Sequence, residues 1–258
     1  MSDVIVLKFG GTSLATPGRV RLAARRVRAH ADLGRRVVVV VSAAGRTTDR
    51  ILSGLARLGP PSTSEGACRE MDRALATGED RSAALLASAL WRLGVPARSL
   101  RGGEAGVRVE GTYGGGRIVA VEAAALERLL DAGIVPVVSG FQGERPDGET
   151  LTLGRGGSDT SAVAIAAALG APCHLVTDVE AVFDRDPRLD RSARPFRALD
   201  HATLVALAEG GARVVHPAAA RVALEAGVPL RVYHFRAPLA GAGTSVNTVA
   251  AAAEGGAA

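Results

Sequence analysis

Residues 37–41 are five consecutive valines, VVVVV, and the sequence SAAGRTTD follows them at residues 42–49. A short run in which every residue is apolar predicts a strand that is buried on both faces, as in a parallel sheet covered by helices on both sides. The small polar residues predict a loop after this strand, leading into a helix over residues 49–58. The valine run therefore predicts an α/β fold.

Strands and helices alternate outward from this run. Apolar segments predict further strands over residues 3–8, 96–100, 134–139, 173–177 and 230–233. Helical spacing predicts helices over residues 19–30, 67–76, 81–93, 121–132, 160–169, 202–209 and 217–226. Residues 102–116 are rich in glycine and are expected to be irregular or hairpin-like, and residues 146–148, Pro-Asp-Gly, predict a turn between two extended arms. Alternating strands and helices favour a largely parallel sheet with helices on both sides.

Composition excludes some classes of function. The chain has 258 residues and a formal charge of +5, but its arginines are spread along helical faces beside Glu and Asp. Without a dense basic run or interleaved aromatic residues, a nucleic-acid partner is not expected.

No apolar run reaches the roughly 18 residues that a membrane helix needs. A strand begins almost at the N-terminus with no leader pattern before it, so a cytoplasmic location is expected.

Lysine occurs once. Of 31 Lys plus Arg residues only Lys8 is lysine, and it lies at the end of the first predicted strand. Arginine presents a broad planar fork, whereas lysine carries a compact charge on a flexible stem. One interpretation is chance survival of a single lysine codon. The other is that position 8 requires a small point charge.

Three glycine-bearing loops follow predicted strands, where ligands of open α/β sheets bind. The first is residues 8–13, KFGGTS, in which Gly10 and Gly11 could let backbone N–H groups approach an anion beside Lys8. The lysine precedes the glycines, so this is not the P-loop pattern, and GxGxxG is absent as well. A purely structural turn stays open as an alternative.

The second loop, residues 154–160, has the sequence GRGGSDT and opens a predicted helix. Free N–H groups at a helix N-terminus favour phosphate, and Arg155 could pair with a carboxylate or phosphate. Asp159 could orient a lysine or a metal in phosphoryl transfer, or it could simply cap the helix.

The third loop, residues 177–188, carries four acidic residues and two arginines. It could surround a nucleotide with its Mg²⁺, or it could be a solvated charged loop.

Two further segments are candidates for the same site. The hydroxyls of residues 42–49 follow the valine strand, and Thr77-Gly78-Glu79 is expected at a glycine break between two helices. On spacing alone, Glu79 could be an ordinary surface acid.

Taken together, the motifs resemble the aspartate kinase branch of the amino-acid kinase family over residues 4–246. They are VLKFGGTSL, VVVVVSAAGRTTDRIL, REMDRALATGE, GFQGERPDGETLTLGRGGSDTSAVAIAAALGA, VTDVEAVFDRDPR and GVPLRVYHF. The GRGGSDT stretch is highly specific to that branch. The resemblance implies a three-layer αβα sandwich with a mostly parallel central sheet. It also implies phosphoryl transfer from Mg-ATP to the β-carboxylate of aspartate, with no metal site besides the Mg²⁺ that ATP carries.

The resemblance also assigns roles to individual residues. Lys8 would neutralise charge on the moving phosphoryl group, and Asp159 would organise the site. The substrate would be bound by Thr48 (or Thr47), Glu79 on its ammonium, Arg155 on its α-carboxylate, and Ser158. The nucleotide would lie among Lys8, Gly10, Gly11, Thr177, Asp178, Phe183, Asp184, Asp186, Arg188 and Arg213.

Three departures from the family pattern stand out. Arg213 replaces the lysine of the family's GAKV, and Ala181 and Asp184 change the nucleotide loop. The third is that the chain ends at Ala258, where typical family members continue into ACT regulatory domains. We expect one catalytic domain over residues 1–246, with an amino-acid lobe first and a nucleotide lobe over roughly 155–246. Residues 247–258 are expected to form a flexible Ala/Gly tail.

Three hypotheses follow for function. The leading one is an aspartate kinase without ACT-mediated feedback control. The second is a carboxylate kinase acting on a modified or related amino acid in a specialised pathway. The third is a non-catalytic binding subunit that associates with a separate regulatory chain. A homodimer is expected from the resemblance.

Overall fold

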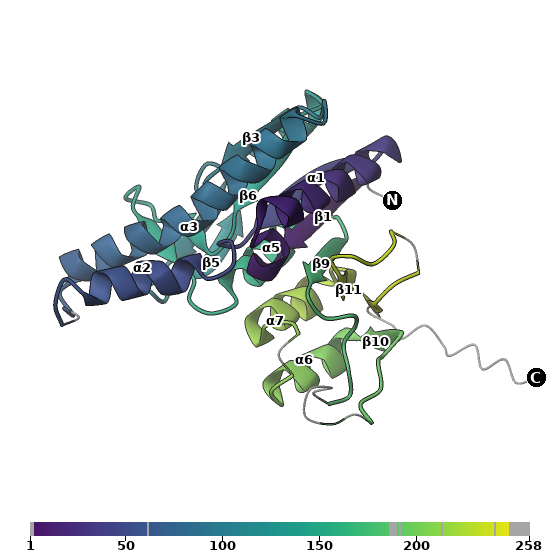
Figure 1. Cartoon of the computed structure of the whole chain (residues 1–258). Helices are drawn as coiled ribbons and strands as arrows, with labels where there is room; N and C mark the ends of the chain where they lie inside the picture. Colours follow the sequence, from purple (N-terminus) through teal and green to yellow (C-terminus); the bar gives the residue numbers. More distant parts are fainter. Residues whose placement is uncertain are drawn as a thin grey trace, which may run out of the picture.

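The computed structural model describes residues 3–60, 62–185, 190, 192–212, 214–239 and 241–247. Its main sheet has eight strands in the order β10-β12-β11-β9-β1-β2-β6-β3. Figure 1 shows β3, β6, β1, β9, β11 and β10 following one another in this succession across the molecule. Their bounds are β1 Val4–Phe9, β2 Arg36–Val41, β3 Ala97–Leu100, β6 Val135–Ser139, β9 Cys173–Thr177, β10 Ala198–Asp200, β11 Leu230–His234 and β12 Thr244–Asn247. The run from β11 to β3 is parallel throughout, whereas β12 is antiparallel to β11 and β10 is parallel to β12.

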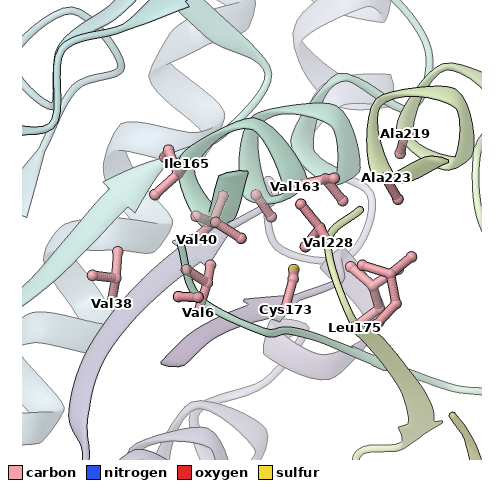
Figure 2. Packing of buried hydrophobic residues seen from close by; sticks show 14 of the residues in the cluster. Val6, Val38, Val40, Val163, Ile165, Cys173, Leu175, Ala219, Ala223 and Val228 are labelled. Carbon is pink, nitrogen blue, oxygen red and sulfur yellow. The ribbon is translucent and has the colours of Figure 1, made fainter. Parts of the chain in front are cut away.

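Helices cover both faces of this sheet, and the valine strand divides its side chains between them. Val38 and Val40 belong to one buried cluster with residues of α4 (Ala124–Asp131), α5 (Gly157–Ala168), α6 (His201–Glu209) and α7 (Pro217–Ala226), part of which Figure 2 shows. Val37, Val39 and Val41 belong to a second cluster with α1 (Pro17–Asp32) and α3 (Glu65–Trp91). This alternation confirms the predicted three-layer αβα sandwich with a mostly parallel sheet.

A second sheet of four strands lies beside the main one, in the order β5-β4-β7-β8. Its strands are β4 Val107–Glu110, β5 Arg117–Val121, β7 Gln142–Glu144 and β8 Thr150–Thr152. β7 and β8 form the antiparallel pair predicted around Pro146-Asp147-Gly148. β5 was not predicted: residues 118–121 are apolar, but they follow a glycine-rich segment and remain exposed or half-buried in the structure.

The predicted break at residues 77–79 is wrong, because α3 runs without interruption from Glu65 to Trp91. Glycine in a helix interior costs about 1 kcal/mol relative to alanine. Here a Cβ on Gly78 would lie 2.9 Å from the Cβ of Ala43 and 3.5 Å from Cγ2 of Thr47. Gly78 therefore lets α3 approach the loop after β2, where a larger side chain would push the two apart.

The two reversed strands, β10 and β12, were not predicted either. They are short, with three and four residues, so they carry little periodicity. The flexible tail was predicted to begin at residue 247, but Asn247 is the last residue of β12. The rest of the predicted tail lies outside the described residues.

The proposed division into two lobes stays a prediction. In the described part of the chain, no helix combines the length and apolar character needed to cross a membrane.

Asp72 joins α3 to the second sheet. Its side chain is 1% exposed; Oδ2 accepts hydrogen bonds from the Thr152 N–H at 2.7 Å and the Gly114 N–H at 3.0 Å, and Oδ1 accepts from the Thr152 hydroxyl at 2.9 Å. Removing the carboxylate would leave buried donors without partners. We expect Asp72→Ala to lower the free energy of unfolding by about 2–4 kcal/mol.

Urea unfolding measures this loss. Asp72→Asn is the conservative variant: the amide oxygen can accept the two backbone bonds while its NH₂ donates to the threonine hydroxyl, so most of the stability should return. Asp32→Ala, at an exposed position of α1, is the control and should change stability by less than about 0.5 kcal/mol. An Asp72→Ala protein as stable as that control would contradict the anchoring role.

Candidate active site

Four parallel strands end at the same edge of the main sheet, and the loops that follow them meet there. β1, β2, β6 and β9 run in one direction, with Phe9 paired to Val41 and Val176, and Val41 paired to Ser139. In open α/β sheets, ligands bind outside this edge. The predicted site residues that follow these strands are thus brought to one place.

The two glycines after β1 hold neighbouring loops together. The Gly10 N–H donates to the carbonyl of Val176 at 3.2 Å, and the Gly45 N–H donates to the carbonyl of Gly11 at 2.8 Å. A Cβ on Gly11 would lie only 2.5 Å from the carbonyl oxygen of Ala43, which is backbone and cannot turn aside. Gly11 is therefore required for this loop contact. Phosphate binding by the two glycines stays a prediction.

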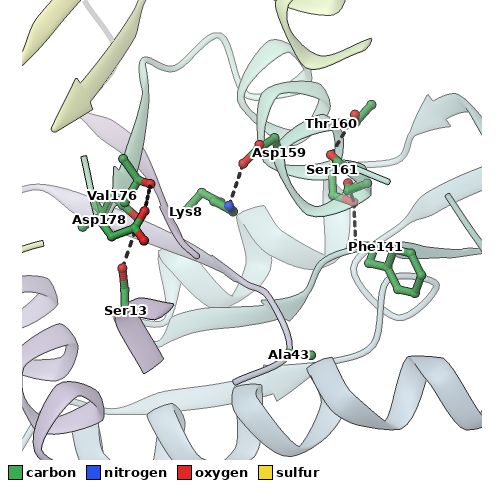
Figure 3. Close-up of polar contacts among 12 residues, drawn as sticks. Lys8, Ser13, Ala43, Phe141, Asp159, Thr160, Ser161, Val176 and Asp178 are labelled. Carbon is green, nitrogen blue, oxygen red and sulfur yellow. Dashed lines mark hydrogen bonds and ion pairs between the residues drawn. The ribbon is translucent and has the colours of Figure 1, made fainter. Parts of the chain in front are cut away.

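Lys8 and Asp159 form an ion pair at the centre of this edge (Figure 3). The Lys8 Nζ lies 2.6 Å from Oδ1 of Asp159, with side chains 12% and 16% exposed. Asp159 does not cap α5: the N-cap residue is Gly156, and the N–H groups of Gly157 and Asp159 donate to backbone carbonyls instead. A Cβ on Gly10 would lie 3.6 Å from Nζ, so glycine leaves open space beside the ammonium. The capping alternative is wrong, and the orienting one fits the geometry.

Glycines at and near the N-terminus of α5 allow close backbone contacts that a larger residue would prevent. α5 begins at Gly157, before the predicted residue 160, so the GGSD sequence forms its first turn. Gly156 has φ 73°, and a Cβ there would lie 2.0 Å from the ring of His216. Ser158 is buried, and a Cβ on Gly140 would lie 2.9 Å from its Cα. These contacts place the start of α5 against the end of β6.

Glu79 is buried rather than on the surface. Its residue is 4% exposed, Oε1 accepts a hydrogen bond from the Ala43 N–H at 2.9 Å, and Oε2 is buried with no partner among the described residues. Burial raises the pKa of Glu79 to about 7, although the Ala43 N–H and the charge of Lys8 act in the opposite direction. The prediction of an ordinary surface acid is wrong. A carboxylate with one free oxygen can accept hydrogen bonds from a cation that enters the site.

The remaining substrate candidates lie around this group. The Thr47 hydroxyl donates to the carbonyl of Ala44 at 2.7 Å in the first turn of α2 (Thr47–Ala56), whereas Thr48 makes no side-chain hydrogen bond within the described chain. Arg155 is exposed and forms no ion pair with any described residue. The side chains of Thr48 and Arg155 are therefore available to bind a ligand. Substrate binding by these two residues stays a prediction.

The loop after β9 holds the first nucleotide candidates. The Thr177 hydroxyl donates to Oδ1 of Asp178 at 3.2 Å, and Asp178 is exposed at the same edge as Lys8. Asp186, Arg188 and Arg213, which were also predicted to surround the nucleotide, lie outside the described residues. Nucleotide binding by this loop stays a prediction.

Farther along the loop, local contacts occupy the candidates. Phe183 forms an isolated antiparallel bridge with Pro195. Oδ1 of Asp184 accepts from the Arg194 N–H at 2.9 Å, so this carboxylate closes the loop on itself. Ala181, where the family pattern has glycine, is buried. The two departures at residues 181 and 184 thus have structural roles of their own.

A pocket of about 360 Å³ opens beside Asp159. Its lining comes from the start of α5 and the α6–α7 connection: Gly156, Asp159, Ala208, Gly211, Ala212, Val215, His216 and Pro217. His216 was not predicted; it is the N-cap of α7, and its Nδ1 accepts from the Ala218 N–H at 3.4 Å. A histidine before the proline that begins a helix was the signal in the sequence. Space for a ligand therefore lies next to the Lys8–Asp159 pair.

Carboxylates at this edge suit a hard cation. Across the described residues, no group of three or more His, Cys, Asp or Glu side chains could hold a metal ion by itself. Mg²⁺ binds oxygen ligands and commonly takes one or two carboxylates together with substrate phosphates and waters. Asp159 and Asp178 offer such oxygens, so the residues present fit a Mg²⁺ that arrives with a nucleotide.

Sequence comparison places this site among known proteins. The profile of the amino acid kinase family matches residues 3–234. The chain is 43% identical over 230 residues to an aspartokinase of Thermus thermophilus, covering 89% of this chain and 56% of that protein. It is 44% identical over 230 residues to aspartokinase 2 of Bacillus subtilis, covering 89% and 55%. The chain thus spans about half the length of the curated relatives it matches.

Solved structures agree with the sequence comparison. Aspartate kinase from Synechocystis superimposes with a TM-score of 0.80 at 39% identity, over 95% of this chain and 40% of that one. Escherichia coli aspartokinase III, in complex with aspartate and ADP, superimposes with a TM-score of 0.81 at 27% identity, over 95% and 64%. Two solved aspartate kinase structures therefore share the fold of this chain over nearly its whole length.

Proposed function

The chain belongs to the amino acid kinase family, and from that premise we propose that it transfers the γ-phosphoryl group of ATP to the β-carboxylate of L-aspartate. The observation that carries this proposal is the Lys8–Asp159 ion pair lying at the same strand edge as the buried, half-partnered carboxylate of Glu79. A zwitterionic acid presents one cation and two anions. The site offers a matching set of charges.

Lys8 is the group that stabilises the transferred phosphoryl. Phosphoryl transfer needs positioning and electrostatic stabilisation more than covalent help. The ammonium of Lys8 is partly buried and held at 2.6 Å by Asp159, so little reorganisation is needed when negative charge develops. Asp159 is the positioning residue of the pair. No general base is required, because the acceptor carboxylate is ionised near pH 7.

Glu79 holds the substrate ammonium. Oε1 is occupied by the Ala43 N–H, and Oε2 is the buried acceptor that remains. An ammonium on Oε2 would replace the water that the carboxylate lost on folding, and it would draw the pKa of Glu79 down from about 7. Substrate binding near neutral pH therefore releases protons from Glu79.

Arg155 and Thr48 complete the substrate site in this proposal. A guanidinium without an ion-pair partner can bind the α-carboxylate by two parallel hydrogen bonds. The hydroxyl of Thr48, or that of Thr47, orients the substrate at the start of α2, and Ser158 lies at the start of α5. Together these contacts would leave the β-carboxylate facing Lys8.

The nucleotide is assigned to the pocket beside Asp159. The positive end of the α5 dipole and the ammonium of Lys8 favour phosphate oxygens there. The loop of Thr177 and Asp178 ends at the same edge. Mg²⁺ bound with the nucleotide would neutralise phosphate charge, and Asp159 and Asp178 are the carboxylates that would hold it.

The test is an assay for the acyl phosphate product. With saturating Mg-ATP, L-aspartate should cause ADP release, and added hydroxylamine should give the aspartyl hydroxamate. L-Glutamate and succinate complete the panel, since succinate lacks the ammonium that Glu79 would bind. Absence of aspartate-dependent ADP release would overturn the proposal. Equal turnover of succinate would overturn the role of Glu79 alone.

The pKa of Glu79 also predicts a pH dependence. Below about pH 7 the free protein holds Glu79 protonated, and a protonated carboxyl is a poor acceptor for an ammonium. We expect kcat/KM for aspartate to fall up to about tenfold per pH unit below pH 7, while the KM for ATP changes little. Initial rates between pH 5.5 and 8.5 measure this. A flat profile in that range would contradict the assignment.

A further inference from the structure

A second polar pocket lies at the opposite edge of the main sheet, where the parallel strands begin. Its volume is about 410 Å³, and Arg35, His174 and Arg231 line it together with Asp3. His174 is the second residue of β9 and pairs with Arg231 of β11. The active site lies at the other end of β9, after Thr177. We call these residues, with Arg26 and His30 behind them, the basic pocket.

Arg26 is a buried cation that forms no ion pair with any described carboxylate. It is 8% exposed and donates through Nη2 to the carbonyls of Phe235 and Ala237, while Nε and Nη1 are buried with no partner in the described structure. Its guanidinium also lies 5.0 Å from the ring of Tyr233. Carbonyl bonds and a ring face only partly replace the water that a buried charge loses.

His30 repeats this pattern. It is 1% exposed, and Nη1 of Arg35 lies 3.1 Å from its Nδ1. Arginine only donates, so Nδ1 accepts and the neutral ring carries its proton on Nε2. That Nε2 is buried and has no partner among the described residues. Behind the residues that line the pocket, the Nε2–H of His30 and the Nε and Nη1 groups of Arg26 are therefore buried without an acceptor among the described residues.

The charges around both imidazoles are positive. Burial and the charges of Arg35, Arg26 and Arg231 lower the pKa of His30 to about 4. Burial, His30 and the same arginines lower the pKa of His174 to about 3. None of the three guanidiniums forms an ion pair with a described carboxylate. Asp3, the one acid in the lining, is 61% exposed and lies 3.9 Å from Arg36 instead.

We propose that the basic pocket binds a small anion with two or more negative charges, through phosphoryl or carboxylate oxygens. Three arginines against one acid leave a positive excess that a multivalent anion balances. Guanidinium groups match both oxyanion classes, since each can donate two parallel hydrogen bonds. Arg35 and Arg231 line the cavity itself, so their guanidiniums can contact the anion directly, and the charge of Arg26 behind them adds to the positive potential at His174.

Histidine resonances separate this pocket from the active site. The chain has five histidines; His30 and His174 report on the basic pocket, and His216 reports on the pocket beside Asp159. In ¹⁵N-histidine-labelled full chain, magnesium-free pyrophosphate should shift the ring signals of His30 and His174 and raise the pKa of His174, because a bound anion stabilises the imidazolium. Citrate and chloride at matched ionic strength are the comparison: citrate distinguishes phosphoryl from carboxylate ligands, and chloride reports screening.

Variants at the partly exposed arginines test the assignment without disturbing the core. Arg35→Gln and Arg231→Gln should each weaken pyrophosphate or citrate binding at least tenfold by calorimetry. Arg128→Gln, at an exposed arginine of α4 with no ion pair in the described chain, is the control and should bind as the wild type does. Shifts confined to His216, equal shifts with chloride, or unchanged binding by both pocket variants would overturn the proposal.

Discussion

Replacing Lys8 by alanine is expected to lower kcat about a thousand-fold, the loss typical of removing a preorganised group that stabilises transition-state charge. The chain has no second lysine to take its place. The ammonium lies 2.6 Å from Asp159 and is largely shielded from solvent, so water cannot supply the same stabilisation. The KM for aspartate should change less than tenfold, because in the proposed site Glu79 and Arg155, not Lys8, would hold the substrate. Single-turnover rates at saturating substrates measure the loss.

Two companion variants test whether position 8 needs a compact charge. Lys8→Arg keeps the charge but brings a broad fork into a site whose open space is set by Gly10, and we expect a ten- to hundred-fold loss in kcat. Asp159→Asn keeps the size of the positioning residue and removes its charge, and it should also lower kcat. Arg117→Ala, at an exposed position of β5, is the control. Lys8→Ala turnover within tenfold of the control would contradict the proposed role.

Replacing Glu79 by glutamine is expected to raise the KM for aspartate ten- to hundred-fold while the KM for ATP stays the same. The amide keeps the size of the side chain and can still accept from the Ala43 N–H, but it loses the charge that attracts an ammonium. The fall of kcat/KM below pH 7 should disappear as well. Glu70→Gln, 66% exposed on the same helix, is the matched control.

Although Glu79→Gln should weaken substrate binding, it should raise the free energy of unfolding at alkaline pH. The folded pKa of Glu79, about 7, lies above its ordinary value of 4.5, so its contribution to stability is fully present below pH 4.5 and is lost as pH rises through 7. Without substrate at pH 8, Glu79→Gln should therefore be more stable than wild type, on the order of 2 kcal/mol. At pH 4.5 the two should be similar. Urea unfolding at both pH values checks this, and a less stable variant at pH 8 would contradict it.

Much of the central sheet could be predicted from sequence. The valine run and the strand that ends near Lys8 are almost wholly apolar, and segment 173–177 is apolar apart from His174 and Thr177; short runs of this kind are typical of buried parallel strands. β5, β10 and β12 could not be predicted. They are short or half-exposed, and pairing with neighbours rather than their own pattern determines their conformation.

The candidate site was predicted in part. Lys8, Asp159 and Glu79 were identified from motifs and family resemblance, and the structure brings Lys8 and Asp159 into contact. His216 was missed, because a helix-capping histidine has no periodic pattern around it. The basic pocket was missed for a similar reason: α1, β9 and β11 contribute its residues separately, and in sequence each is one polar residue among many.

The sequence by itself determined the αβα class. It also determined where along the chain the apolar segments of the central strands lie and which residue types follow them. Hydrophobic periodicity and glycine positions are local properties, so they can be read before the chain folds. Tertiary structure alone decided that α3 continues through Gly78, that Glu79 is buried with one oxygen unpartnered, and that two histidines lie neutral among three arginines. Burial and charge proximity depend on which segments pack together. Desolvation, which sets the pKa values of Glu79, His30 and His174, exists only after that packing.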